Sequence, residues 1–217
     1  MNTTFRPALL VIDMQYDFVH GSLAVEGGHS IIDTVNLLLA LPFVAKIASK
    51  DYHPPNHISF AETHQKPVFS KIRLLHPDGG EESLEQVLWP VHCVADTPGS
   101  EFVEGLHSGA LTSIVHKGTH PSIEMYSAFR DPWHLENTVL PSVLESHGVT
   151  DVFIVGIAGD YCVKSTALDA VDFGYKTWVV RDAVRSVSFE GTEWTDMQLK
   201  GVRIVDSEEV KRMIRDS

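Results

Sequence analysis

The sequence predicts an α/β protein of three layers (α/β/α), in which helices cover both faces of a mainly parallel, doubly wound, Rossmann-like sheet of about six strands. Short apolar runs alternate with helix-like segments along the chain. The clearest runs have no polar interruption, as expected of strands that are buried on both faces. A length of 217 residues with 43% hydrophobic residues allows one sizeable core. We therefore expect a single domain over residues 1–217.

Six runs are expected as strands. They are 8–12, 43–49, 111–116, 152–157, 177–181 and 202–205. The run at 8–12 has no polar residue, and the run at 152–157 is the clearest. The run at 43–49 is a weaker candidate, and the run at 111–116 carries β-branched residues. Helical patterns lie between several of them, at 30–41, 135–146, 165–173 and 192–199. Alternation of this kind favours a parallel sheet with helices on both faces.

The segment from about 52 to 109 interrupts this alternation. It is rich in proline, histidine, glycine and glutamate and shows no long periodic element, although Pro67–Arg73 could form a short edge strand. A loop of this length inside a compact domain is usually functional. We expect it to be an insertion over the active face.

Composition excludes several classes of partner and points to a compartment. A net charge of −12 disfavours nucleic acid and anionic membrane surfaces as partners. No apolar stretch approaches the roughly 20 residues of a membrane span, and the first residues lack the apolar region of a signal peptide. Cys93 and Cys162 lie far apart in the sequence, which favours two free thiols over a disulfide. These features lead us to expect a cytoplasmic protein.

Cys162 is the strongest indication of an enzyme. It follows the apolar run Val152–Ile157 and a short turn, and a helical pattern begins directly after it. Helix N-termini carry unpaired N–H groups and a partial positive charge, and both favour the nucleophilic thiolate. The alternative is that Cys162 is a small core residue.

Other reactive side chains follow other expected strands. Asp13 comes after the first strand and Lys117 after the third. Ligands of open α/β sheets bind at the carboxyl ends of the strands, so these groups and Cys162 are expected to converge. Taken singly, Asp13 could be a helix cap and Lys117 a solvated residue before the turn at Gly118.

Three residues have the pattern of a metal site. Asp51 and His53 are two positions apart, so on an extended segment they point to one face. His92 would complete a set of two histidines and one carboxylate, which suits zinc or iron. The alternative is a hydrogen-bonded Asp–His pair, because twelve histidines make chance matches common. Motifs for dinucleotides, phosphate-binding loops and serine hydrolases are absent from the sequence.

Five segments together resemble the nicotinamidase (pyrazinamidase) family of isochorismatase-like cysteine hydrolases. They are Ile12-Asp-Met-Gln-Tyr-Asp-Phe18, Asp51-Tyr-His-Pro54, Leu88-Trp-Pro-Val-His-Cys93, His116-Lys-Gly118 and Gly156-Ile-Ala-Gly-Asp-Tyr-Cys-Val163. The resemblance extends from Asp13 to about Asp182. The Asp-x-His pair and the Trp-Pro-x-His-Cys stretch are typical of the metal-containing nicotinamidase branch.

The resemblance implies a role for each matching residue. Asp13, Lys117 and Cys162 would form the catalytic triad, and Asp51, His53 and His92 would bind one divalent metal ion, usually zinc, with iron or manganese as alternatives. Phe18, Trp89 and Tyr126 would line the ring pocket. The backbone N–H groups of Ala158 and Cys162 would bind an oxyanion beside a cis Ile157–Ala158 bond. Tyr52 stands where the family often has tryptophan, and His57, Glu62, His64 and Glu124 are left without a role.

The implied activity is hydrolysis of nicotinamide to nicotinate and ammonia through a thioester on Cys162, in NAD salvage, with pyrazinamide as an analogue. One alternative is a metal-independent isochorismatase-like amidase or hydrolase that acts on another small substrate. Another is a non-enzymatic α/β domain in which Cys162 senses redox state. The oligomeric state stays open, a homo-oligomer included.

Overall fold

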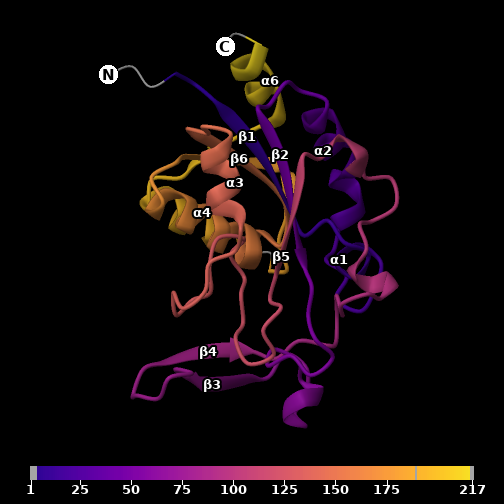
Figure 1. The fold of residues 1–217 in the computed structure, drawn as a ribbon. Coiled ribbons are helices and arrows are strands. Elements are labelled where there is room, and N and C mark those ends of the chain that lie inside the picture. Colours follow the sequence, from indigo (N-terminus) through magenta and orange to yellow (C-terminus); the bar gives the residue numbers. More distant parts are fainter. Residues whose placement is uncertain (1–3, 189, 216–217) are drawn as a thin grey trace.

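The structure is a computed structural model that describes residues 4–188 and 190–215. Its centre is a six-stranded sheet in which every pair of neighbouring strands is parallel (Figure 1). The strands are β1 (Pro7–Ile12), β2 (Ala45–Asp51), β5 (Ser113–Lys117), β6 (Asp151–Ile157), β7 (Lys176–Arg185) and β8 (Arg203–Val205). All six expected strands are present, with boundaries that differ by a few residues.

The strand order is β5-β2-β1-β6-β7-β8, the doubly wound order. The chain builds one half of the sheet outward from β1 and then returns to build the other half from β6. Leu10 of β1 pairs with Ile47 of β2 on one side and with Ile154 of β6 on the other. The topological switch point therefore lies between β1 and β6, where a ligand crevice is expected beyond the carboxyl ends of the strands.

Helices cover both faces of the sheet (Figure 1). The α-helices are α1 (Tyr16–Val19), α2 (Ile32–Leu39), α3 (Leu140–Ser146), α4 (Lys164–Asp172), α5 (Thr192–Leu199) and α6 (Ser207–Arg215). Alternate side chains of β1 enter two separate cores: Leu9 and Val11 pack with α2 and α6, while Leu10 packs with α3, α4 and α5. The predicted three-layer fold is thus confirmed.

Three helices differ from expectation, and one of them, the short α1, was not predicted. The third expected helix begins at Leu140 and not at residue 135, with Pro141 in its first turn. Helix α6 was not predicted, because its sequence is mostly charged. Only Val210 and Ile214 of its apolar positions are buried, and their spacing of four residues places both on one face.

The segment from 52 to 109 contains a hairpin of its own. β3 (Lys71–Leu75) pairs antiparallel with β4 (Ser83–Val87) in a separate two-stranded sheet. The strand expected near Pro67–Arg73 therefore exists, but it is not an edge strand of the main sheet. Short helical turns of this segment lie at 62–64 and 98–100, and another at 108–110 lies at its end. A further short turn, at 28–31, lies directly before α2. The hairpin lies beyond the carboxyl end of the central sheet, far from both termini (Figure 1).

No helix in the described ranges combines the length and the apolar character that crossing a bilayer requires.

Candidate active site

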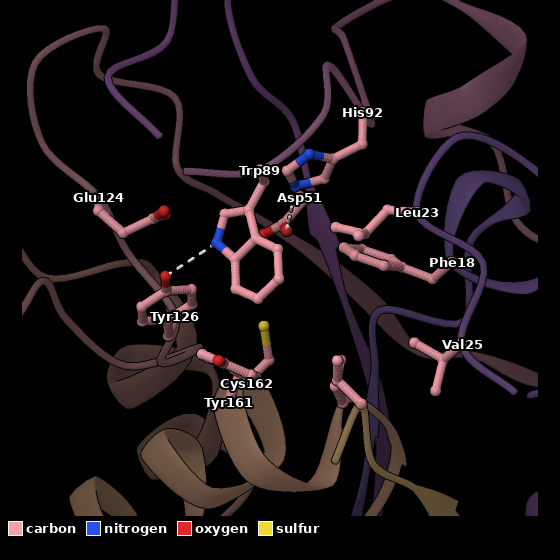
Figure 2. Close-up of a pocket in the computed structure, with 12 residues that line it drawn as sticks. Phe18, Leu23, Val25, Asp51, Trp89, His92, Glu124, Tyr126, Tyr161 and Cys162 are labelled. Carbon is pink, nitrogen blue, oxygen red and sulfur yellow. Dashed lines mark hydrogen bonds and ion pairs between the residues drawn. The ribbon is translucent and has the colours of Figure 1, made fainter. Parts of the chain in front are cut away.

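A small pocket, with a cavity volume of about 30 Å³, lies at the switch point. Its lining comes from α1 and the loop after it, the end of β2, the 52–109 segment and the segments that follow β5, β6 and β7: Phe18, Leu23, Val25, Asp51, Trp89, His92, Glu124, Tyr126, Ala158, Tyr161, Cys162 and Val187. The sulfur of Cys162 points into the pocket, with Trp89 and Tyr126 on one side and Phe18 and Leu23 on the other (Figure 2).

Cys162 lines this pocket, and Lys117 and Asp13 lie behind it as a buried cluster. The ammonium of Lys117 lies 2.9 Å from Asp13 Oδ2 and 3.4 Å from Cys162 Sγ. Both Asp13 and Lys117 are almost completely buried. The other oxygen of Asp13 accepts a hydrogen bond of 2.7 Å from the hydroxyl of Ser49 on β2. Reactive groups 149 positions apart in sequence thus share one crevice, as the sequence analysis expected.

Two carboxylates compete for the single ammonium. Lys117 pairs with Asp51 as well as with Asp13. Burial raises the pKa of Asp13, and the charge of Asp51 adds to that rise despite the opposing effect of Lys117. Burial also acts against ionisation of Asp51, but Lys117 and His53 outweigh it and hold the pKa of Asp51 well below its usual value. Asp13 is therefore the carboxylate of the pair that is better suited to accept a proton.

The chain reaches Cys162 through an unusual turn. After β6 the Ile157–Ala158 peptide bond is cis, as the resemblance implied. Residues Gly159–Val163 then form a π-helical turn that continues into α4. Such turns are frequent at functional sites.

The expected preference of Cys162 for the thiolate form is not found. Burial raises the pKa of the Cys162 thiol well above its usual value, and Lys117 opposes this only in part. Cys162 is 4% exposed, so loss of solvent outweighs the helix terminus. Attack by Cys162 therefore requires a base that removes the thiol proton. Asp13 is the candidate for this base, because it interacts with the Cys162 thiol and its pKa is raised.

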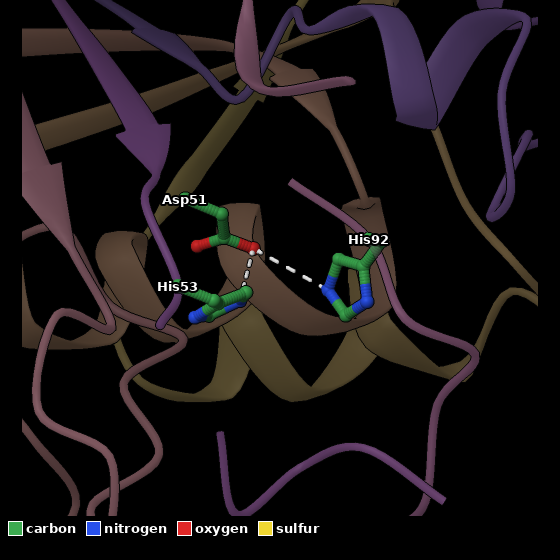
Figure 3. A group of neighbouring side chains, drawn as sticks. All are labelled: Asp51, His53 and His92. Carbon is green, nitrogen blue, oxygen red and sulfur yellow. Dashed lines mark ion pairs between the residues drawn. The ribbon is translucent and has the colours of Figure 1, made fainter. Parts of the chain in front are cut away.

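Asp51, His53 and His92 form a compact group beside this cluster (Figure 3). The Oδ2 atom of Asp51 lies 3.4 Å from His53 Nε2 and 3.9 Å from His92 Nε2. All three residues are buried. The group has the donor types and spacing that a divalent metal ion requires.

The hydrogen bonds of both histidines fit this use. His53 Nδ1 lies 2.8 Å from the carbonyl of Gly118, and His92 Nδ1 lies 2.7 Å from the carbonyl of Pro90. Each Nδ1 therefore donates a proton to a carbonyl, and each Nε2 faces Asp51, the position from which a histidine binds a metal ion. Burial and the neighbouring His53 lower the pKa of His92 to about 4, so its ring is neutral, as a metal ligand must be.

Among the described residues that were left without a role, His57 and Glu124 form a second possible ligand group with His53, whereas Glu62 and His64 belong to no such group. His57 stacks on His53, but Ser59 contacts one of its ring nitrogens at 2.7 Å and the carbonyl of Ile123 the other at 3.2 Å. His64 Nε2 lies 2.7 Å from the carbonyl of Ile58. Glu62 is exposed to solvent.

Aromatic side chains form the walls of the pocket. Phe18 packs on the ring of His92, and Trp89 meets Tyr161 edge-to-face at 4.8 Å between centroids. The indole N–H of Trp89 donates to the hydroxyl of Tyr126 at 3.0 Å (Figure 2). The three predicted ring-pocket residues thus line one cavity, which suits a flat heteroaromatic ligand.

Ala158 and Cys162, whose N–H groups were expected to bind an oxyanion, also line the pocket. Sequence reasoning missed Leu23, Val25, Tyr161 and Val187 and left Glu124 without a role. Tyr161 could have been found, because it directly precedes Cys162. The apolar members gave no signal, since isolated aliphatic residues in loops carry no pattern.

Comparison with known proteins assigns the chain to a family of α/β proteins. Residues 7–209 match the isochorismatase domain family, and the chain belongs to it. A nicotinamidase of Saccharomyces cerevisiae is 40% identical over 190 residues, which cover 83% of this chain and 88% of the yeast protein.

Solved structures agree with this assignment. A nicotinamidase/pyrazinamidase structure from Acinetobacter baumannii is similar with a TM-score of 0.87 at 39% identity, covering 96% of this chain and 100% of that chain. A pyrazinamidase of Pyrococcus horikoshii, solved in complex with zinc, has a TM-score of 0.72 at 36% identity and covers 93% and 99% of the two chains.

Proposed function

We propose that this chain is a nicotinamidase, which hydrolyses nicotinamide to nicotinate and ammonia in NAD salvage. One observation carries the proposal: the Asp13–Lys117–Cys162 cluster and the group of Asp51, His53 and His92 adjoin the same aromatic-walled pocket. The relatives named nicotinamidase, similar over most of their length, support the same activity.

In the first half of the reaction, the thiol proton of Cys162 passes to Asp13 and the sulfur attacks the carboxamide carbon. Lys117 stabilises the charge that shifts between these two groups. The carbonyl oxygen becomes an oxyanion, which the N–H groups of Ala158 and Cys162 would bind. Removing one such donor typically costs a hundredfold or more in rate. Asp13 then returns its proton to the leaving nitrogen, the C–N bond breaks, and ammonia departs from a thioester.

In the second half, water attacks the thioester carbon and gives a proton to Asp13. The C–S bond breaks and Asp13 returns that proton to the sulfur, while the second proton of the water leaves with the product acid, which ionises in solvent to nicotinate. One carboxylate thus serves as base and then as acid in each half of the reaction.

Asp51, His53 and His92 would hold a divalent metal ion, for which we propose zinc, with iron or manganese as alternatives. When bound, the ion supplies a Lewis-acidic anchor for a ligand atom at this end of the pocket. The thiol is already a nucleophile, so the protein has no need of a metal-activated water for the attack on the amide.

The test measures ammonia release from nicotinamide and metal content on the same sample. We expect turnover with about one metal ion per chain, and loss of that ion in His53→Ala and His92→Ala. Cys162→Ala should keep the metal and bind nicotinamide but form no product, while Cys93→Ala, the matched variant of the other cysteine, should keep most of the turnover. Near wild-type turnover by Cys162→Ala would end the thiol mechanism. An active protein without metal would favour the metal-independent relative.

Three further expectations are kept as proposals. The chain forms one hydrolase domain over residues 1–217, with an insertion at about 52–109. The protein is cytoplasmic and has no nucleic-acid or membrane partner. Pyrazinamide is a second substrate. Light scattering would decide whether the chain forms a homo-oligomer.

A further inference from the structure

The β3–β4 hairpin carries one buried polar residue. Among the strand residues Lys71–Leu75 and Ser83–Val87, only Gln86 is buried, at 4% exposure. Its neighbour Glu85 is exposed and pairs with Lys71 on the outer face. A buried amide is costly unless its hydrogen bonds are satisfied, so its partners identify what it does.

The partners of Gln86 lie in the wall of the pocket. Its Nε2 atom lies 2.8 Å from the hydroxyl of Tyr126 and 3.2 Å from Glu124 Oε2. It also lies 2.6 Å from the carbonyl of Val87, which holds the amide against its own strand. Tyr126 and Glu124 both line the pocket (Figure 2). A residue of the hairpin thus contacts the ring pocket through its polar wall.

Two N–H donors converge on one oxygen atom. The hydroxyl of Tyr126 accepts from Gln86 Nε2 and, at 3.0 Å, from the indole of Trp89. Trp89 follows β4 by two residues, so both donors come from the same stretch of chain. Two donors on one hydroxyl restrict the orientation of the tyrosine side chain that lines the pocket. Glu124 is held in the same way, between Gln86 and the backbone N–H of Met125.

We propose that Gln86 is a positioning residue of the ring pocket, and that it acts through the hydroxyl of Tyr126. The hairpin is then part of the substrate site. Gln86 does not line the pocket itself, so its loss should weaken binding of the ring more than it slows the bond-breaking steps at Cys162. This inference rests on the proposed nicotinamidase function.

The test compares Gln86→Met with wild type. Methionine keeps the length of the side chain and removes both N–H donors. We expect KM for nicotinamide and the Kd of nicotinate, measured calorimetrically, to rise about tenfold while kcat stays within about threefold. Glu85→Met, on the outer face of the same strand, is the matched control and should leave all three values unchanged. Unchanged KM and Kd in Gln86→Met would overturn the inference.

A second background separates positioning from simple anchoring of the hairpin. In Tyr126→Phe the acceptor is gone, so adding Gln86→Met should change the Kd of nicotinate by less than about twofold. A full tenfold effect in that background would show that Gln86 does not act through Tyr126 and would overturn the inference. If the wild-type protein releases no ammonia from nicotinamide, both the proposed function and this inference are wrong. If the wild type is active and Gln86→Met has unchanged KM and Kd, only this inference is wrong.

Discussion

Gln15 and Asp51 exchange two hydrogen bonds. The side-chain amide of Gln15 donates to the backbone carbonyl of Asp51 at 2.8 Å, and the backbone N–H of Asp51 donates to Gln15 Oε1, also at 2.8 Å. Gln15 is completely buried and also donates to the carbonyl of Ser100. A residue of the loop after β1 thereby fixes the last residue of β2, whose carboxylate faces both His53 and His92.

We expect Gln15→Ala to weaken metal binding by about 10- to 100-fold, as loss of residues that orient metal ligands typically does. The change leaves the N–H and carbonyl of Asp51 without their partner, so the carboxylate is no longer held toward the histidines. Chelator titration monitored by metal analysis would measure the effect. Gln198→Ala, at an exposed position of α5, is the control. Equal metal affinity in the two variants would contradict the role of Gln15.

Gly118→Ala should displace a proposed metal ligand. A Cβ atom at this position would lie 2.7 Å from His53 Nδ1, and the residue has φ +61°. The added methyl group must push the imidazole away from Asp51, so metal content and turnover should both fall by at least tenfold. Both can be measured on one preparation.

Gly174→Ala provides the control for backbone strain. Gly174 has φ +89°, but a Cβ atom there would meet nothing within 4 Å. It carries the same conformational penalty, of about 1 kcal/mol, without the collision. If Gly174→Ala lost as much metal as Gly118→Ala, the collision with His53 would not be the cause.

The parts of the fold that sequence predicts best are the buried strands. β1 and β6 were recognisable because uninterrupted apolar runs occur where both faces of a strand are covered. Of the β3–β4 hairpin only a short strand near Pro67–Arg73 was expected, because its strand residues are half polar and only Gln86 among them is buried, so no long apolar run marks the pair. Helix α6 was missed for a related reason, since charged residues surround its narrow apolar stripe.

The reactive groups of the site were predictable because each ends or follows a recognisable strand. Asp13, Asp51 and Lys117 are of this kind, and strand ends meet at one edge of a parallel sheet. The residues that orient them were not predictable. Ser49 and Gln86 look like ordinary polar residues until tertiary contacts bring them to Asp13 and Tyr126. The pKa of Cys162 was misjudged because burial cannot be read from the start of a helix alone.

Asp13→Asn should lower kcat by about 1,000-fold. Asparagine keeps the shape of the side chain, and Lys117 keeps its pairing with Asp51, so the fold should persist. The loss reflects removal of the proposed base, whose contribution is typically 100- to 10,000-fold. Ammonia release measures it, with circular dichroism to check folding. Asp172→Asn, at a surface ion pair with Arg130, is the control. A kcat within tenfold of wild type would exclude Asp13 as the base.

Alkylation of Cys162 by iodoacetamide should accelerate as pH rises. Burial raises the pKa of this thiol, so the protonated form dominates near neutral pH and the reactive thiolate increases about tenfold per pH unit below that pKa. Mass spectrometry resolves Cys162 from Cys93, which is completely buried, does not line the pocket and should react more slowly. Bound nicotinate should protect Cys162. A labelling rate that is already constant below pH 7 would mean that Lys117 outweighs burial, and Asp13 would then not be needed to remove the proton.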